Sequence, residues 1–213
     1  MSDHPCIFFD YRGHHKTPTP KNHDYLTFDA LAQDISGLLN HLEIPKASFW
    51  GHSFGAQVLI RTYDMFPEIF ENMIFINGFA SNPLVNFVAA DFVPNMFRLF
   101  KRGYEGFPET VKYLWKVSVN NPLAIYLSTV AGGFNTQLTH MKDIEIYAKG
   151  VESIAPEVFI KMFEQMLNYD GTADLDRIEI PTLIVSGKND KVTPVEYQDL
   201  LHKRIKGRSE EHT

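Results

Sequence analysis

The chain has one cysteine, no excess of basic residues and no long apolar run, and each absence excludes a class of protein. Cys6 alone cannot form an internal disulfide. Lys and Arg number 20 against 26 Asp and Glu, and no basic stripe is interleaved with aromatic residues, which argues against a nucleic-acid partner. No run of about 18 apolar residues is present, so the sequence predicts no membrane span. The histidines lack metal-ligand spacing, and we expect neither a metal nor another cofactor.

The sequence also shows no internal repeat, no low-complexity segment and no signal peptide. The cytoplasm is therefore the default location, unless a signal belongs to a longer N-terminal part. The 213 residues can bury one sizeable core, and the apolar content of 44% and charged content of 22% are those of an ordinary globular protein.

Apolar runs alternate with amphipathic segments in the first part of the chain. Residues 6–10 predict a short buried strand, which makes Cys6 a core thiol. Thr27 is expected to cap a helix with one apolar face, formed by Leu31, Ile35, Leu38, Leu39 and Leu42. A strand over 48–50, a helix that stops before Pro67 and a strand over 72–78 follow. This order predicts an α/β fold with a doubly wound, mostly parallel sheet.

The pattern changes between residues 79 and 173. No strand-like run recurs there, and aromatic and methionine side chains are spread through stretches with helical spacing. We expect residues 79–173 to form a helical cap and residues 1–78 and 174–213 to form the core. Sheet character returns at 178–187, and a helix is predicted over 195–205.

The strongest signal is Gly-His-Ser-Phe-Gly at residues 51–55. A predicted strand precedes it and a predicted helix follows, which is the context a Gly-x-Ser-x-Gly nucleophile elbow requires. Side chains at Gly51 and Gly55 would be expected to clash with the neighbouring strand and helix. The turn lifts the Ser53 hydroxyl out of the sheet and directs the backbone N–H of Phe54 toward a developing oxyanion.

A serine nucleophile needs a base that a carboxylate orients, and Asp190 is the candidate carboxylate. Asp190 lies just past the carboxyl end of the strand predicted within 178–187, where open α/β sheets place their sites. The chain order Ser53 then Asp190 also fits. The alternative is that Asp190 only shapes an Asx turn before Pro194.

These segments together resemble the α/β-hydrolase superfamily, in its large group with a serine nucleophile and a helical cap. Residues 9–14 resemble the Asp-x-Arg-Gly motif after the family's fourth strand, and residues 51–55 match the elbow after its fifth. Residues 181–187 with Asp190 match the seventh strand and the acid loop. The resemblance covers nearly the whole chain except the cap. Because Ser53 stands at the nucleophile position, it implies hydrolysis of an ester, thioester, amide or carbon–carbon bond.

The resemblance also implies two parts for which the chain offers no clear counterpart: an oxyanion loop after the third strand and a base histidine after the eighth. His212 is the histidine nearest the expected place for that base, so the predicted catalytic residues are Ser53, Asp190 and His212. The alternatives are that His212 is a solvated terminal residue and that the base lies beyond the chain end. We hypothesise that the chain lacks both termini of a longer hydrolase; a native protein with an intact mass of 24.4 kDa would contradict this.

The sequence therefore predicts a serine hydrolase of the esterase type that acts through an acyl-enzyme on a Ser-His-Asp triad. The partner is a small-molecule substrate, and apolar cap residues favour an apolar acyl or aromatic portion over a sugar or phosphate. Two alternatives remain: a non-catalytic scaffold that binds a small ligand, and an inactive fragment with unpaired sheet edges.

Overall fold

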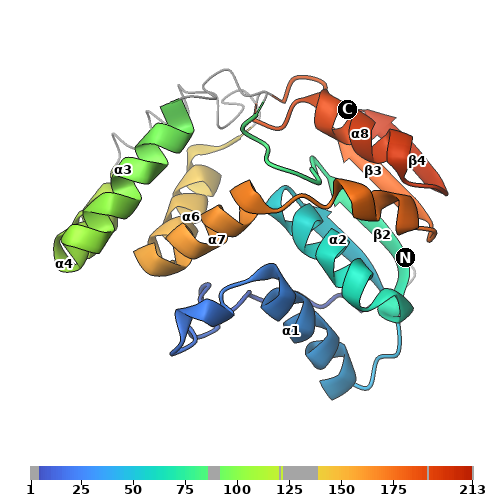
Figure 1. The fold of residues 1–213 in the computed structure, drawn as a ribbon, viewed down its shortest axis with the longest axis horizontal. Helices are drawn as coiled ribbons and strands as arrows, with labels where there is room; N and C mark the ends of the chain where they lie inside the picture. The colour runs from blue at the N-terminus through green and yellow to red at the C-terminus, as the bar shows by residue number, and fades with distance from the viewer. Residues whose placement is uncertain (1–4, 86–91, 120, 122–138, 191, 213) are drawn as a thin grey trace.

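The computed structural model describes residues 5–85, 92–119, 121, 139–190 and 192–212 (Figure 1). One four-stranded sheet runs in the order β1-β2-β3-β4, and all neighbouring strands are parallel. Its strands are β1 (Ala47–His52), β2 (Phe70–Ile76), β3 (Thr182–Ser186) and β4 (Arg208–His212). The parallel strands and the helices between them confirm the predicted α/β fold.

The helices fall into two groups along the chain. Those outside the segment between β2 and β3 are η1 (His23–Tyr25), α1 (Phe28–His41), α2 (Phe54–Met65), η2 (Pro67–Ile69) and α8 (Val195–Arg204). Those between β2 and β3 are α3 (Phe92–Gly106), α4 (Pro108–Val119), α6 (Met141–Glu152), α7 (Pro156–Asn168) and η4 (Thr172–Arg177). Figure 1 shows α3, α4, α6 and α7 gathered on the left, away from β3 and β4.

Helix α1 begins where the sequence predicts. The Thr27 hydroxyl oxygen accepts a hydrogen bond from the Ala30 N–H at 3.2 Å, which satisfies one of the free donors of the first turn. Leu31 and Leu39 are buried, as expected of the apolar face. Leu42 is 44% exposed, because the helix ends one residue earlier and Leu42 leaves the stripe.

The core lies on the face of the sheet that α2 and α8 contact. Phe75 of β2 and Ile184 of β3 are paired neighbours on that face and are fully buried. Successive side chains of a strand point to opposite faces. Trp50 of β1 accordingly lies on the other face, and it is 70% exposed.

The strand predicted over residues 6–10 is not formed. This segment has no regular secondary structure, and the Phe8 side chain is 94% exposed. A strand requires a hydrogen-bonding neighbour, and among the described residues β1 pairs with β2 alone. An apolar run without such a ladder does not become a strand. Cys6 is exposed as a result, and its prediction as a core thiol is wrong.

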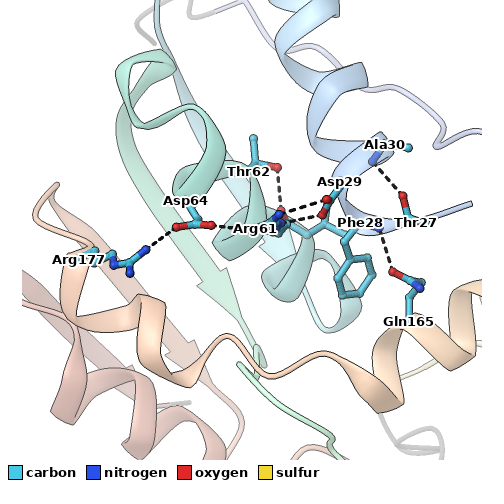
Figure 2. A network of polar contacts seen from close by, with 10 residues as sticks. Thr27, Phe28, Asp29, Ala30, Arg61, Thr62, Asp64, Gln165 and Arg177 are labelled. Atoms are coloured by element: carbon cyan, nitrogen blue, oxygen red, sulfur yellow. Dashed lines mark hydrogen bonds and ion pairs between the residues drawn. The ribbon is translucent and has the colours of Figure 1, made fainter. Parts of the chain in front are cut away.

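Arg61 of α2 joins elements that are distant in sequence (Figure 2). Its guanidinium donates to both carboxylate oxygens of Asp29 in α1, at 2.7 and 3.1 Å, and these hydrogen bonds lower the pKa of Asp29. It also donates to Asp64, which accepts a further hydrogen bond from Arg177 of η4 at 2.7 Å. The network therefore connects α1, α2 and the segment leading into β3.

Gln57 of α2 forms hydrogen bonds near both ends of the segment between β2 and β3. Its side chain is fully buried, and Nε2 donates to the carbonyls of Ser81 at 3.2 Å and Met166 at 3.1 Å. The two ends are also joined directly, because the Gly171 N–H donates to the Ala80 carbonyl at 2.9 Å. One side chain thus holds the places where this helical segment leaves the core and rejoins it.

Replacement of Gln57 by Ala should lower the free energy of unfolding by about 1–3 kcal/mol, because two carbonyls lose their donor. Urea denaturation measures this change. Gln33→Ala makes the same chemical change on the exposed side of α1 and should alter stability by less than about 0.5 kcal/mol. Equal stability of the two variants would contradict the role of Gln57 in holding the two ends of this segment.

Candidate active site

Ser53 forms the whole turn between β1 and α2. Its φ of 51° and ψ of −119° are rare for a residue other than glycine. The Ser53 N–H donates to the Ile76 carbonyl at 3.0 Å, which extends the β1–β2 ladder by one residue. Helix α2 starts at the next residue, Phe54. The chain therefore makes the sharp strand–turn–helix passage predicted from residues 51–55.

The two elbow glycines have different roles. A Cβ at Gly51 would lie 2.8 Å from Leu59 Cδ1 and 2.9 Å from the Gly55 carbonyl oxygen, so the predicted clash is correct there. A Cβ at Gly55 would meet only the Tyr11 hydroxyl, at 3.7 Å, which is an ordinary contact. The clash predicted at Gly55 is wrong, because this position faces Tyr11 and not the packed side of β1.

Aromatic side chains surround the start of α2. Phe54 makes edge contacts with Tyr11 and Phe28, with ring centroids 6.2 and 5.2 Å apart, and Phe28 contacts Tyr169 at 5.0 Å. Burial raises the pKa of Tyr11 to about 12, so its hydroxyl stays protonated at neutral pH. Because Phe54 is the first residue of α2, its N–H has no partner within the helix.

The Asp190 carboxylate is held by four hydrogen bonds in the loop after β3. Oδ1 accepts from the N–H groups of Val192 at 2.8 Å and Thr193 at 2.9 Å. Oδ2 accepts from the Thr193 hydroxyl at 2.9 Å and from Asn77 Nδ2 at 2.8 Å. Asp190 thus shapes a local turn, which was the structural alternative considered from the sequence, and its carboxylate orientation is fixed.

Asn77, which the sequence did not single out, is part of this arrangement. It follows β2 with a φ of 47°, and its side-chain Oδ1 accepts the Gly187 N–H at 3.0 Å. In the sequence, the pair Asn77-Gly78 after an apolar run could have predicted a turn at this position, since asparagine tolerates the left-handed backbone.

Two histidines lie at the end of the sheet where Ser53 and Asp190 are found. His212 ends β4 and pairs with Ser186 of β3, so its backbone is at the carboxyl edge, as are Ser53 and Asp190; its side chain lies outside the described residues. His52 precedes Ser53 and is exposed on the same face as Trp50.

In the described part of the chain, no group of three or more His, Cys, Asp or Glu residues is arranged to hold a metal. None of the described helices is both long and apolar enough to cross a membrane.

The glycine contacts give a matched pair of variants. Gly51→Ala should destabilise the protein by about 1–3 kcal/mol, because the added methyl group meets backbone as well as the Leu59 side chain. Gly55→Ala should be tolerated, with a change of less than about 0.5 kcal/mol. Thermal unfolding of both proteins tests the prediction, and a larger loss in Gly55→Ala would show that the contacts at the elbow are misassigned.

The sequence and the fold can be compared with those of known proteins. A family model described as "alpha/beta hydrolase fold" matches residues 2–116. The chain is 26% identical over 198 residues to a non-heme chloroperoxidase, CPO-A1, from Kitasatospora aureofaciens, covering 89% of this chain and 66% of that protein. It is 22% identical over 219 residues to Karrikin insensitive 2 receptor IA from Petunia hybrida, covering 98% and 72%.

Among solved structures, an esterase from Exiguobacterium antarcticum aligns with a TM-score of 0.68 at 15% identity, over 95% of this chain and 70% of that one. That likeness concerns the fold. The chain spans about two thirds of the length of the first curated relative, 66%. The match to the family model, together with the parallel sheet and the turn at Ser53, shows that this chain belongs to the α/β-hydrolase fold family.

Proposed function

We propose that the chain is a serine hydrolase of the esterase type, with Ser53 as the nucleophile. The observation that carries this proposal is the turn at Ser53, which has a backbone φ of 51° and links a parallel strand to a helix whose first N–H has no partner within the helix. The position of Asp190 at the end of a parallel strand in the same sheet supports it. The proposed partner is a small-molecule acyl compound such as a carboxylic ester.

In the proposed mechanism the Ser53 hydroxyl oxygen attacks the carbonyl carbon of the ester while a histidine takes the hydroxyl proton. The Phe54 N–H donates to the oxyanion that forms. Collapse of this intermediate breaks the ester bond, and the histidine returns the proton to the leaving alcohol. Water, deprotonated by the same histidine, then releases the acid from Ser53.

We assign Asp190 as the carboxylate that orients the histidine, and His212 as the histidine that acts as the base. The backbone of His212 lies at the same sheet edge, which favours it as the base. A histidine N–H must share or replace one of the four donors now bound to Asp190. The Thr193 hydroxyl is the donor best suited to give way, because a hydroxyl can rotate and backbone N–H groups cannot.

The surroundings of Ser53 support a partly apolar substrate, since the partly buried rings of Phe54 and Tyr11 lie beside the turn, backed by the fully buried Phe28. We further propose that residues 79–173 form a cap and that the rest is the core. Aromatic rings of α3, α4 and α7 pack on one another inside this segment, so most of them serve packing rather than substrate contact: Phe97, Phe100, Trp115, Phe159 and Phe163.

A second candidate is a scaffold that binds a small ligand without turnover. The similarity to a protein named as a receptor, over 98% of this chain, favours it. The two candidates differ in whether Ser53 is activated.

Labelling with a fluorophosphonate probe distinguishes them. We expect one adduct by intact mass, lost in Ser53→Ala and retained in Ser48→Ala, which removes an exposed serine from β1, the strand that leads to Ser53. Hydrolysis of a short-chain p-nitrophenyl ester should fall by about 10⁴-fold or more in Ser53→Ala.

Circular dichroism of each protein confirms that it is folded. Labelling that survives in Ser53→Ala would overturn the assignment of the nucleophile. A folded native chain that takes no label would favour the scaffold over the hydrolase.

A further inference from the structure

Asn77 stands between the strands that lead to Ser53 and Asp190. It follows β2, the strand between β1 and β3. The Ser53 N–H donates to the carbonyl of Ile76, the residue before Asn77, at 3.0 Å, and the Asn77 N–H donates to the Val185 carbonyl at 2.8 Å. Backbone hydrogen bonds therefore tie the Ile76-Asn77 unit to the strands on both sides.

The side-chain amide of Asn77 uses both of its ends on the loop that carries Asp190. Oδ1 accepts the N–H of Gly187, the first residue after β3, at 3.0 Å. Nδ2 donates to Asp190 Oδ2 at 2.8 Å. These two contacts fix the start of the loop and its carboxylate relative to β2, and only a group with both a donor and an acceptor can make them.

The backbone restricts the residue type further. With a φ of 47°, position 77 is in the left-handed region, which glycine, asparagine and aspartate adopt more readily than other residues. Glycine has no side chain, and an ionised aspartate cannot donate to Asp190. Asparagine alone combines this backbone with an amide donor.

We propose that Asn77 is a positioning residue, which holds the Asp190 carboxylate in the orientation that receives the N–H of the base; this inference rests on the proposed function. Asn77 acts through Asp190 and not on the substrate. Without the amide donor, Asp190 Oδ2 keeps only the Thr193 hydroxyl, the donor that gives way to the base, so the carboxylate holds the base less precisely in line with Ser53. The rate constant of the chemical step should then fall about 10- to 100-fold, as expected for one hydrogen bond to a charged group, while substrate binding is retained.

Two variants of Asn77 test this, with a matched control. Asn77→Asp keeps the shape, the left-handed backbone and the acceptor for Gly187, and replaces only the donor to Asp190 by a repelling oxygen. Asn77→Gly keeps the backbone freedom and adds no charge, so it remains informative if the aspartate variant does not fold. Asn72→Asp places the same new charge near the amino end of the same strand.

The measurement is the time course of fluorophosphonate labelling at several probe concentrations. In this reaction the Ser53 oxygen bonds to phosphorus, fluoride leaves, and the base takes the hydroxyl proton. The time courses give a maximal rate constant and a half-saturating concentration, and thermal unfolding is recorded beside them. Both Asn77 variants should lose about 10- to 100-fold in the rate constant at an unchanged half-saturating concentration. Asn72→Asp should stay within about twofold of the unmodified chain.

The possible failures are distinguishable. Ser53-dependent labelling in the unmodified chain, together with native constants in both Asn77 variants, overturns the inference and leaves the proposed function intact. If both Asn77 variants unfold, Asn77 has a merely structural role and the inference is overturned. The same holds if the rate constant and the half-saturating concentration both change along with thermal stability. Absence of Ser53-dependent labelling in the unmodified chain overturns the proposed function, and the inference falls with it.

Discussion

The hydrogen bond from the Ser53 N–H to the Ile76 carbonyl is the contact on which the candidate site depends. It carries the β1–β2 ladder one residue past β1, so the chain must reverse within Ser53 itself before α2 begins. Gly51 allows this because Leu59 of α2 and the Gly55 carbonyl oxygen occupy the space that a side chain would need. The left-handed backbone of Ser53 is thus a consequence of a strand and a helix that are packed as closely as their backbones permit.

The sequence was sufficient where the determining interactions are local. The cap at Thr27, the helix stop before Pro67 and the turn at Ser53 depend on neighbouring residues, and each is present in the structure. It failed at residues 6–10, because a strand depends on a partner that no local pattern reveals. Asn77 was missed for a related reason, since its side chain acts on a loop more than a hundred positions later. An Asn-Gly pair predicts a turn but not what the amide will bind.

The helical segment between β2 and β3 is joined to the core at both of its ends and along α7, whose Val158 and Met162 are buried in the main core. Gln57 and the contact between Ala80 and Gly171 hold its two ends, while the Arg61 network joins α1 and α2 to η4, the last helix of the segment. The aromatic rings of α3, α4 and α7 pack within the segment itself. The segment therefore has its own packing and a fixed attachment, and α2, the helix that starts at the elbow, supplies both Gln57 and Arg61.

The two interpretations of Asp190, an Asx turn and a catalytic acid, are compatible in physical terms. A carboxylate that orients a histidine must itself be held, and the N–H groups of Val192 and Thr193 that define the turn also fix the plane of the carboxylate. A loop that left Asp190 mobile would lose rotational freedom at each turnover and so weaken the alignment of the base. The local turn is therefore a requirement of the proposed chemistry, and its presence does not count against a catalytic role.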